Sequence, residues 1–411
     1  MNAGCGCERG NLATLDEVLT HLREEALSLP GLEAQQVPLK QARGMVLVEA
    51  VSSVINVPPA DNSAMDGYAL CAADARTETV LRVSQRIPAG IAPQPLVPGT
   101  CARIFTGAEI PAGADAVVMQ EDTEVLPDGS VRIPAVLAGA NVRRAGQDIA
   151  IGARLFDAGR RLHPADIGLL ASIGVPTVAV ARRLRVAVLS SGDELVQPGE
   201  ALAPGQLYNS NQFTLVSTLE DMGFEVHDAG TLPDDLVATR LRLTELASSV
   251  DVIISSGGVS VGEEDHLKAA VEAEGRLVLW KLGIKPGKPL AFGYVNETPF
   301  IGLPGNPVAV WVTLLVAAIP WLRWRQGESY TPPVPHPVPC AFRRKAGKRR
   351  EYLRVQRQAT PDGVRLVAYP NQSSGVLSSV SWADGLAWQE PGQIVNEGDA
   401  LAFVSFAEWL S

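Results

Sequence analysis

The sequence contains little cysteine, and the cysteines do not form the pattern of a disulfide framework. They stand at positions 5, 7, 71, 101 and 340, an odd and sparse set among 411 residues. This usage is typical of a protein in a reducing cytoplasm. Cys5 and Cys7 could hold a metal or form a redox couple, but their spacing is not that of a zinc knuckle. We favour a tail with incidental thiols.

The chain also lacks a long apolar segment. The longest apolar run, residues 308–322, contains Pro320 and is too short to span a membrane, so it predicts a buried helix. The N-terminus shows no basic start followed by an apolar segment. We therefore expect no signal peptide, no membrane association and a cytoplasmic location.

Positive charge is scarce as well. Lys and Arg number 35 against 45 Asp and Glu, which gives a formal net charge of −10 at pH 7. Nucleic-acid binding depends on neutralising phosphates with Lys and Arg, so this balance argues against a nucleic-acid partner. An anionic ligand must instead be bound by local features of the chain.

The remaining composition, with 46% hydrophobic and 19% charged residues, is that of a folded protein, and the length requires several domains. We predict a multidomain α/β plus β architecture. Residues 1–55 and 141–181 are expected to form one discontinuous helical domain, because each segment contains a helical pattern, at 12–28 and at 164–173. Short β-like runs between Pro and Gly turns predict a small inserted β domain at 56–140.

The second half of the chain has a different pattern. Strand-like and helix-like segments alternate over residues 182–328, which is typical of a doubly wound, mostly parallel α/β domain. Prolines at 329–339 indicate a stiff linker. Residues 340–411 predict a C-terminal β barrel or sandwich. At its start, the basic run 343–350 is typical of a solvated hairpin tip, with contact to a substrate phosphate or an acidic partner as the alternative.

Three glycine-bearing loops in the α/β region are the candidate ligand-binding elements. The apolar run 252–254 predicts a buried strand that ends in Ser-Ser-Gly-Gly, ahead of an amphipathic helical pattern. Strand, glycine loop and helix present backbone N–H groups to an anion, although such a loop can also be a simple tight turn. The loops 285–288 and 303–307 follow further strand-like runs. Because loops after successive parallel strands share one edge of a sheet, we predict a common anion-binding pocket.

Several carboxylates fall beside these loops or at turns. Glu194, Asp234 and Asp265 stand at strand ends or helix starts, where each one alone could be a helix cap. Asp61 lies in a turn-rich segment of the inserted β domain, and Arg144 stands near its end. Taken singly, these residues are also compatible with turn formers and surface charges.

Seven motifs, in their order along the chain, strongly resemble the MoeA family of molybdopterin molybdenumtransferases. They are DNSAMDGYA at 61–69, RIFTGAEIPAGADAVVMQE at 103–121, RRAGQDI at 143–149, SSGDEL at 190–195, SSGGVSVGEED at 255–265, KPGKP at 285–289 and GLPGNPV at 302–308. The resemblance implies a homodimer with four domains per chain, the third shared with the adenylyltransferase of the same pathway. It implies insertion of molybdenum from molybdate into adenylylated molybdopterin, with Mg²⁺ and with release of AMP. That adenylyltransferase and downstream cofactor-handling proteins are possible partners.

The resemblance also assigns roles to positions of this sequence. The catalytic set is Asp61, Thr106, Asp148, Glu194, Asp234, Asp265, Lys281 and Lys285, with Asp61, Thr106 and Asp148 approaching across the dimer interface. Glu194, Asp234 and Asp265 are the expected Mg²⁺ ligands, because a hard cation reconciles carboxylates with anionic substrates. The expected substrate-binding set is Ser255, Ser256, Gly257, Gly258, Ser260, Lys288, Pro304, Gly305, Asn306, Pro307, Arg354 and Ser374, the last two at molybdate.

Two other functions are compatible with parts of this pattern. The α/β domain alone would also resemble a molybdopterin adenylyltransferase, although the motifs before it weigh against that function. A non-catalytic scaffold of the same fold is the second alternative, and the retained acids beside anion-binding loops disfavour it. The sequence does not decide between molybdate and tungstate.

Overall fold

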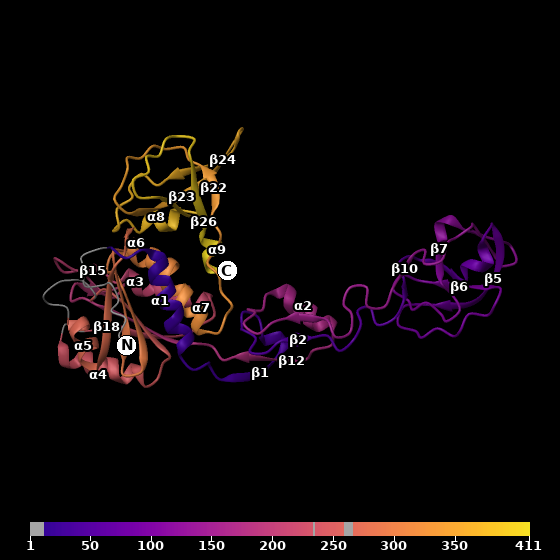
Figure 1. The fold of residues 1–411 in the computed structure, drawn as a ribbon, viewed down its shortest axis with the longest axis horizontal. Helices are drawn as coiled ribbons and strands as arrows, with labels where there is room; N and C mark the ends of the chain where they lie inside the picture. Colours follow the sequence, from indigo (N-terminus) through magenta and orange to yellow (C-terminus); the bar gives the residue numbers. More distant parts are fainter. Residues whose placement is uncertain (1–11, 233–234, 259–265) are drawn as a thin grey trace.

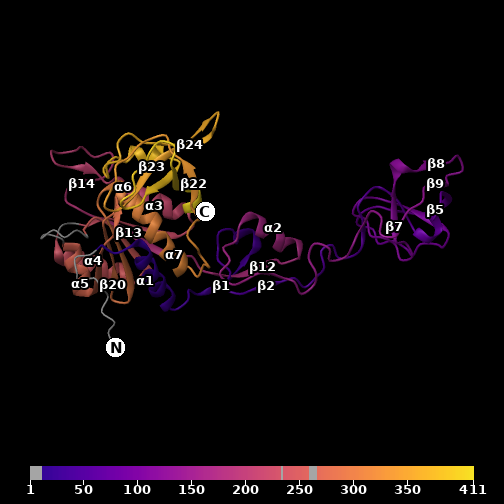
Figure 2. The same ribbon diagram turned by 45° about the horizontal axis from the view of Figure 1, so that its top comes forward.

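The protein is described here by a computed structural model, which covers residues 12–232, 235–258 and 266–411. The chain is elongated (Figure 1). The α/β domain and the C-terminal domain lie together at one end, and the inserted β domain lies at the other (Figures 1 and 2). The segments that connect these two ends form a small domain of their own.

The α/β domain is built on a six-stranded sheet with the order β16-β13-β17-β21-β20-β18. Its strands are β13 (Arg185–Ser191), β16 (Glu225–Leu232), β17 (Val252–Ser256), β18 (Gly275–Lys281), β20 (Pro289–Val295) and β21 (Thr298–Leu303). The four strands from β16 to β21 are parallel, and β20 and β18 join antiparallel. The prediction of a mostly parallel sheet is confirmed. A separate short pair, β14 (Leu195–Val196) and β15 (Leu207–Tyr208), extends from it.

Helices cover both faces of this sheet, as doubly wound folds require. They are α3 (Ser210–Asp221), α4 (Leu236–Ala247), α5 (His266–Glu274), α6 (Pro307–Thr313), the π-helical turn η5 (Leu314–Ala318) and α7 (Ile319–Arg325). Alternate residues of β13 divide between the two cores. Val186 and Val188 pack with α3, α6 and α7, whereas Ala187 and Leu189 pack with α4 and α5. The predicted buried helix is confirmed, since 94% of an 18-residue apolar window of Pro307–Arg325 is buried. The prediction that this run is too short to span a membrane is corrected, because the helix is long and apolar enough by length and composition, and its burial is typical of a core helix.

Local signals placed the helix ends correctly. Asn209 and Asp235 are the N-caps of α3 and α4, and each side chain accepts a hydrogen bond from a backbone N–H of its own helix. Gly223, at φ +85°, follows the end of α3. Pro164 occupies the first turn of α2 (Pro164–Ser172).

The N-terminal helix α1 (Leu15–Ser28) corrects the predicted domain division. It begins with a capping box formed by Thr14 and Glu17. Its buried residues Val18 and Leu22 join the core of the α/β domain, against α7. The assignment of this helix to the discontinuous domain with residues 141–181 was therefore wrong. Periodicity identifies the apolar face of a helix but not the surface that covers it.

The discontinuous domain is mixed rather than helical. Its strands are β1 (Ala34–Pro38), β2 (Val51–Ser52), β11 (Arg154–Phe156) and β12 (Thr177–Ala181), with the 3₁₀ helix η2 (Leu39–Gln41) and α2. β1 pairs with β12 and β2 pairs with β11, both antiparallel, and a core of its own joins the two chain segments. The two segments therefore pack together from residue 34 onward, and the domain that they form contains strands as well as a helix, unlike the predicted helical domain.

A β domain is inserted between the two segments of the discontinuous domain. Its sheet has the order β7-β4-β6-β5-β9-β8, with β4 (Gly67–Leu70), β5 (Thr79–Ile87), β6 (Thr100–Ile104), β7 (Ala116–Met119), β8 (Glu124–Val125) and β9 (Val131–Ile133). Two 3₁₀ helices, η3 (Ala72–Ala75) and η4 (Gln120–Asp122), connect its strands. At the base of the domain, β3 (Asn62–Ser63) pairs with β10 (Val142–Arg143).

The C-terminal domain is a mixed sheet with the order β19-β23-β25-β26-β22, in which β24 also pairs with β23. Its elements are β22 (His336–Pro339), β23 (Arg350–Thr360), β24 (Gly363–Ala368), α8 (Ser378–Trp382), β25 (Gly385–Gln389), β26 (Ala400–Ser405) and α9 (Phe406–Leu410). Because β22 belongs to this sheet, the predicted linker is shorter than 329–339. The edge strand β19 (Ile284–Lys285) comes from the α/β region, so the two domains share a sheet.

Candidate active site

The three predicted glycine loops meet at the carboxyl edge of the parallel strands. Two of them, at 255–258 and 303–307, contribute to a pocket of about 220 Å³, and the third, at 285–288, lines the cavity that adjoins it. The smaller pocket is formed by Ser191, Glu194, Leu195, Asn211, Ser256, Gly257, Gly258, Pro289, Pro304 and Gly305. The Gly257 N–H donates to Leu303 O at 3.1 Å, and Asn211 Nδ2 donates to Gly305 O at 2.7 Å. These bonds tie the loops together. The predicted convergence of the loops is confirmed.

Glycine is required after β17 for steric reasons. Gly257 and Gly258 have φ values of +81° and +66°, in the left-handed region. A Cβ on Gly257 would lie 2.8 Å from Ser191 O, and one on Gly258 would lie 2.8 Å from the Leu267 side chain. The backbone of this loop can approach a ligand only because both positions lack a side chain.

The serines before these glycines differ in their positions. Ser256 lines the pocket, and its Oγ lies 3.2 Å from Ser190 Oγ. Ser255 is fully buried, and its Oγ has no hydrogen-bond partner within the described part of the chain. Only Ser256 of the two therefore lines this pocket.

A second, larger cavity of about 670 Å³ lies between the α/β domain and the C-terminal domain. Its wall consists of Lys285, Pro286, Gly287, Lys288, Pro289, Pro304, Gly305, Asn306, Ala309, Arg344, Arg349, Glu351, Gln372, Ser373 and Ser374. Pro289, Pro304 and Gly305 line both this cavity and the smaller pocket. The two spaces therefore adjoin, and a ligand held by the glycine loops can extend towards the cationic wall.

The larger cavity is cationic. Lys285, Lys288, Arg344 and Arg349 face a single carboxylate, Glu351, among the wall residues that the structure describes. This excess of positive charge favours an anion and offsets the negative charge of the whole chain locally.

The basic run 343–350 is not a solvated hairpin tip, which corrects the preferred prediction. Arg344 forms an ion pair with Glu351, and Arg349 Nη1 donates to Ile284 O at 2.8 Å. Arg350 pairs with Glu390. The acidic partners belong to the C-terminal domain itself, whereas the bond from Arg349 to Ile284 O connects the run to the α/β region.

The predicted molybdate residues have different environments. Ser374 lines the cavity, whereas Arg354 is fully buried behind it. Arg354 donates through Nε to Ser379 Oγ at 3.1 Å and through Nη2 to Ser373 O at 3.3 Å. Burial lowers the pKa of Arg354 to about 10. In this structure Arg354 supports the loop that carries Ser374.

Two other predicted substrate-binding residues, Asn306 and Pro307, stand at the start of α6. Asn306 lines the cavity and is the N-cap of α6, but its side chain makes no capping hydrogen bond to the residues described. Pro307 follows in the first turn. Lys281 is exposed at the end of β18 and is not among the described residues that line either cavity.

The inserted β domain carries a separate polar cluster. Asp61 accepts from Arg144 Nη1 at 2.5 Å and from the Ala145 N–H at 2.8 Å. The backbone hydrogen bond from Ala145, with the Arg144 contact, lowers the pKa of Asp61. Thr106 donates through its N–H and its hydroxyl to Asp66, at 2.7 and 2.8 Å.

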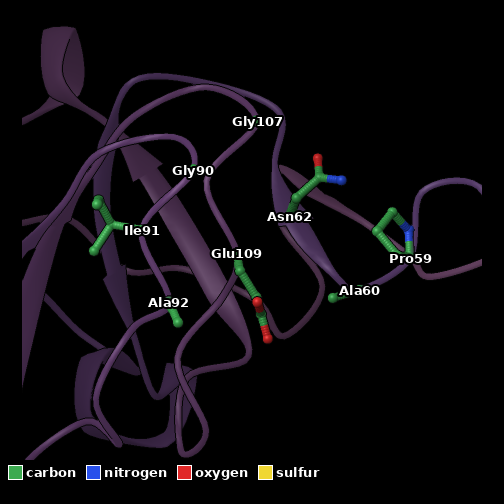
Figure 3. Close-up of a pocket in the computed structure, with 8 residues that line it drawn as sticks. All are labelled: Pro59, Ala60, Asn62, Gly90, Ile91, Ala92, Gly107 and Glu109. Carbon is green, nitrogen blue, oxygen red and sulfur yellow. The ribbon is translucent and has the colours of Figure 1, made fainter.

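A concave surface of about 350 Å³ adjoins this polar cluster (Figure 3). It is lined by Pro59, Ala60, Asn62, Gly90, Ile91, Ala92, Gly107 and Glu109. The inserted β domain that carries it lies at the opposite end of the elongated chain from β14 and β15, and Glu194 directly precedes β14 (Figures 1 and 2). A single chain thus does not bring Asp61, Thr106 and the exposed Asp148 to the glycine loops.

Three predicted site residues, Ser260, Asp234 and Asp265, lie outside the described residues, as do Cys5 and Cys7. Of the expected Mg²⁺ ligands, only Glu194 is placed, and it lines the smaller pocket. Within residues 12–232, 235–258 and 266–411, no group of three or more His, Cys, Asp or Glu residues is arranged to hold a metal ion.

The sequence offered Arg344 and Arg349 only within the alternative interpretation of the basic run, and it did not identify Glu351 as a site residue. The available signal was the acid Glu351 directly after a dense basic run, since such an acid can draw the run into a buried ion pair. The local pattern did not show which domain the run would face.

Glycine loops on a doubly wound sheet, adjoining a cationic cavity that a second domain helps to line, are typical of proteins whose site for an anionic ligand lies between domains. Residues 13–174 match the family model for the MoeA N-terminal region (domain I and II), residues 187–324 match the one for a probable molybdopterin binding domain, and residues 337–406 match the one for the MoeA C-terminal region (domain IV). The chain belongs to the MoeA family of molybdopterin molybdenumtransferases.

Individual relatives agree with this assignment. The molybdopterin molybdenumtransferase of Haemophilus influenzae is 40% identical over 327 residues, which cover 79% of this chain and 80% of that protein. Molybdopterin molybdenumtransferase 2 of Mycobacterium tuberculosis is 38% identical, covering 77% and 81%. The crystal structure of a molybdopterin biosynthesis MoeA protein from Pyrococcus horikosii superposes with a TM-score of 0.78 at 29% identity, covering 96% of this chain and 99% of that one.

Proposed function

We propose that this chain transfers molybdenum from molybdate into adenylylated molybdopterin and releases AMP. The observation that carries the proposal is the adjoining pair of cavities, one walled by glycine loops and the other by cations. The substrate has a phosphoanhydride next to a pterin, so it needs N–H donors for phosphate and a neighbouring site for a second anion. The family-specific matches on both sides of the α/β domain disfavour an adenylyltransferase.

The residues divide this work by their chemistry. The loop at Gly257 and Gly258 can bring backbone N–H groups close to a phosphate, because no side chain intervenes. Lys285, Lys288 and Arg344 supply charge-assisted donors for the oxyanion. The two anions would then lie side by side with their mutual repulsion offset by protein cations.

We propose Glu194, together with Asp234 and Asp265, as the residues that hold Mg²⁺. Carboxylate oxygens are ligands that this ion prefers, and Glu194 already lines the phosphate-sized pocket. When bound, the ion would polarise the phosphoanhydride and neutralise charge on the leaving AMP. Glu194 would otherwise repel the substrate from this pocket.

We further propose that the working unit is a homodimer. Thr106 lies in the inserted β domain, and Asp61 and Asp148 lie in the segments that enter and leave it, whereas Glu194 belongs to the α/β domain at the other end of the chain (Figure 1). A second copy that placed its inserted domain over the glycine loops would complete the site. The concave surface in Figure 3 would then face the substrate.

The decisive experiment incubates the purified protein with adenylylated molybdopterin, molybdate and Mg²⁺, and measures AMP and the metal-loaded pterin. Equal amounts of AMP and loaded pterin are expected, with both lost in Glu194→Gln. AMP without metal loading, or no AMP from folded protein, would overturn the proposal. A parallel reaction with tungstate decides the choice of oxyanion.

A further inference from the structure

Glu351 is an unexpected residue in a cavity that attracts anions. Its side chain is only 10% exposed, and the cavity wall includes it. A buried carboxylate repels an incoming oxyanion and is itself costly to desolvate. Its presence therefore requires an explanation in terms of its partners.

Among the described residues, Glu351 forms ion pairs with two cations of the same cavity. Its Oε1 lies 3.1 Å from Lys285 Nζ and 2.7 Å from Arg344 Nη2. One oxygen thus holds an ammonium group from the α/β region and a guanidinium group from the C-terminal domain. Long Lys and Arg side chains have many rotamers, and this shared contact restricts both.

The backbone around Glu351 brings these partners together. Lys285 in β19 lies opposite Glu351 in β23, in parallel register. The Arg350 N–H donates to Gly283 O at 3.0 Å, on the same pair of strands. The ion pair is therefore built on a rigid junction between two domains rather than on loose surface side chains.

We propose that Glu351 is a positioning residue for the oxyanion: it holds Lys285 and Arg344 in the orientation in which they bind molybdate. This inference rests on the proposed function and adds to it the residue that orients the cations. Glu351 itself does not contact the substrate. Its benefit is that the cations are ordered before the anion arrives, which lowers the entropic cost of binding.

The variants Glu351→Ala and Glu351→Gln test this role. Alanine removes both contacts, so the KM for molybdate should rise about tenfold, with kcat within about twofold. Glutamine keeps an acceptor oxygen of similar reach, so the KM should rise only about threefold. The KM for adenylylated molybdopterin should stay unchanged in both variants, because the glycine loops are intact.

Glu390→Gln is the matched control. Glu390 pairs with Arg350 at 3.0 Å in the same domain, but neither residue is among those described at the cavity wall. This variant loses an ion pair without touching Lys285 or Arg344, so its KM for molybdate should equal that of the parent protein. Thermal unfolding midpoints of all variants report the structural effect separately.

Three kinetic results would overturn the proposal. The first is an unchanged KM for molybdate in folded Glu351→Ala, and the second is an equal rise for both substrates. The third is a lower KM in both variants, which would show that Glu351 only repels the anion. If Glu351→Ala does not fold, the isosteric Glu351→Gln still decides between these results.

Calorimetric titration with molybdate alone separates this proposal from the proposed reaction. If the parent protein releases no AMP but Glu351→Gln binds molybdate more weakly than the parent, the positioning role is supported and the proposed reaction is rejected. AMP release whose molybdate KM does not depend on Glu351 would support the reaction and reject the positioning role.

Discussion

Gly287, in the loop that carries Lys285 and Lys288, offers a quantitative test of the cavity's construction. Its φ is +101°, and a Cβ there would lie 2.6 Å from Thr313 Cγ2. Thr313 is fully buried in α6, and its hydroxyl donates to Ala309 O at 2.8 Å, so it cannot move aside easily. Left-handed backbone costs a non-glycine residue about 1–2 kcal/mol, and overpacking costs about 1–3 kcal/mol. The substitution Gly287→Ala should therefore destabilise the α/β domain by about 2–5 kcal/mol.

A matched variant isolates the steric part of this cost. Gly327 follows α7 with φ +87°, and a Cβ there would meet nothing within 4 Å among the described residues. Gly327→Ala should thus be destabilised only by backbone strain, by about 1–2 kcal/mol. Urea unfolding followed by tryptophan fluorescence reports on both, because Trp280, Trp311 and Trp321 lie in this core.

The KM for molybdate should also be affected more in Gly287→Ala than in Gly327→Ala. A displaced Gly287 moves Lys285 and Lys288 at the cavity wall, so the KM for molybdate should rise in Gly287→Ala and not in Gly327→Ala. Equal stability of the two variants, within about 0.5 kcal/mol, would refute the steric argument.

Three further predictions concern charge. Asp251 accepts hydrogen bonds from Arg182 at 2.6 and 2.7 Å and from the Arg185 N–H at 2.8 Å. Burial acts to raise the pKa of Asp251, but these bonds outweigh it and lower the pKa. The stabilisation is therefore complete above the unfolded pKa of about 3.9 and is lost as pH falls towards the folded pKa. Asp251→Asn should lower the free energy of unfolding by about 2–4 kcal/mol at pH 7 and by less below pH ~4, as measured by urea unfolding at both pH values. A loss of stability that is the same at both pH values would contradict this reasoning. Asp61→Asn and Glu194→Gln, each inactive alone, should recover AMP release when mixed as heterodimers, and verified heterodimers without activity would exclude a shared site. Chelation of Mg²⁺ should stop AMP release and readdition should restore it, whereas full activity in chelator would exclude the ion.

Local patterns predicted much of the α/β domain. The apolar span around 307–325, the caps at Asn209 and Asp235, and the glycines after β17 each depend on residues close in sequence. Such features follow from backbone sterics and local hydrogen bonds, so a sequence states them directly. The convergence of the loops could also be predicted from the sequence, because parallel strands place their carboxyl ends at one edge of the sheet.

Contacts between distant segments were not predictable in the same way. The partner of α1, the cavity facing Arg344, and the pairing of Lys285 with Glu351 all depend on how separate domains pack. Hydrophobic burial and ion pairing have no preferred sequence separation, so many partners satisfy the same local pattern equally well.

The amino-acid sequence alone determined the family, the strand and helix pattern of the α/β domain, and the glycines of the loop after β17. Only the tertiary structure decided that Arg344 and Arg349 of the basic run would line a cavity, and that Glu351 would lie between Lys285 and Arg344 at its wall. The physical reason is that backbone conformation is set mainly by neighbouring residues, whereas the charge on a cavity wall is the sum over segments that only folding brings together.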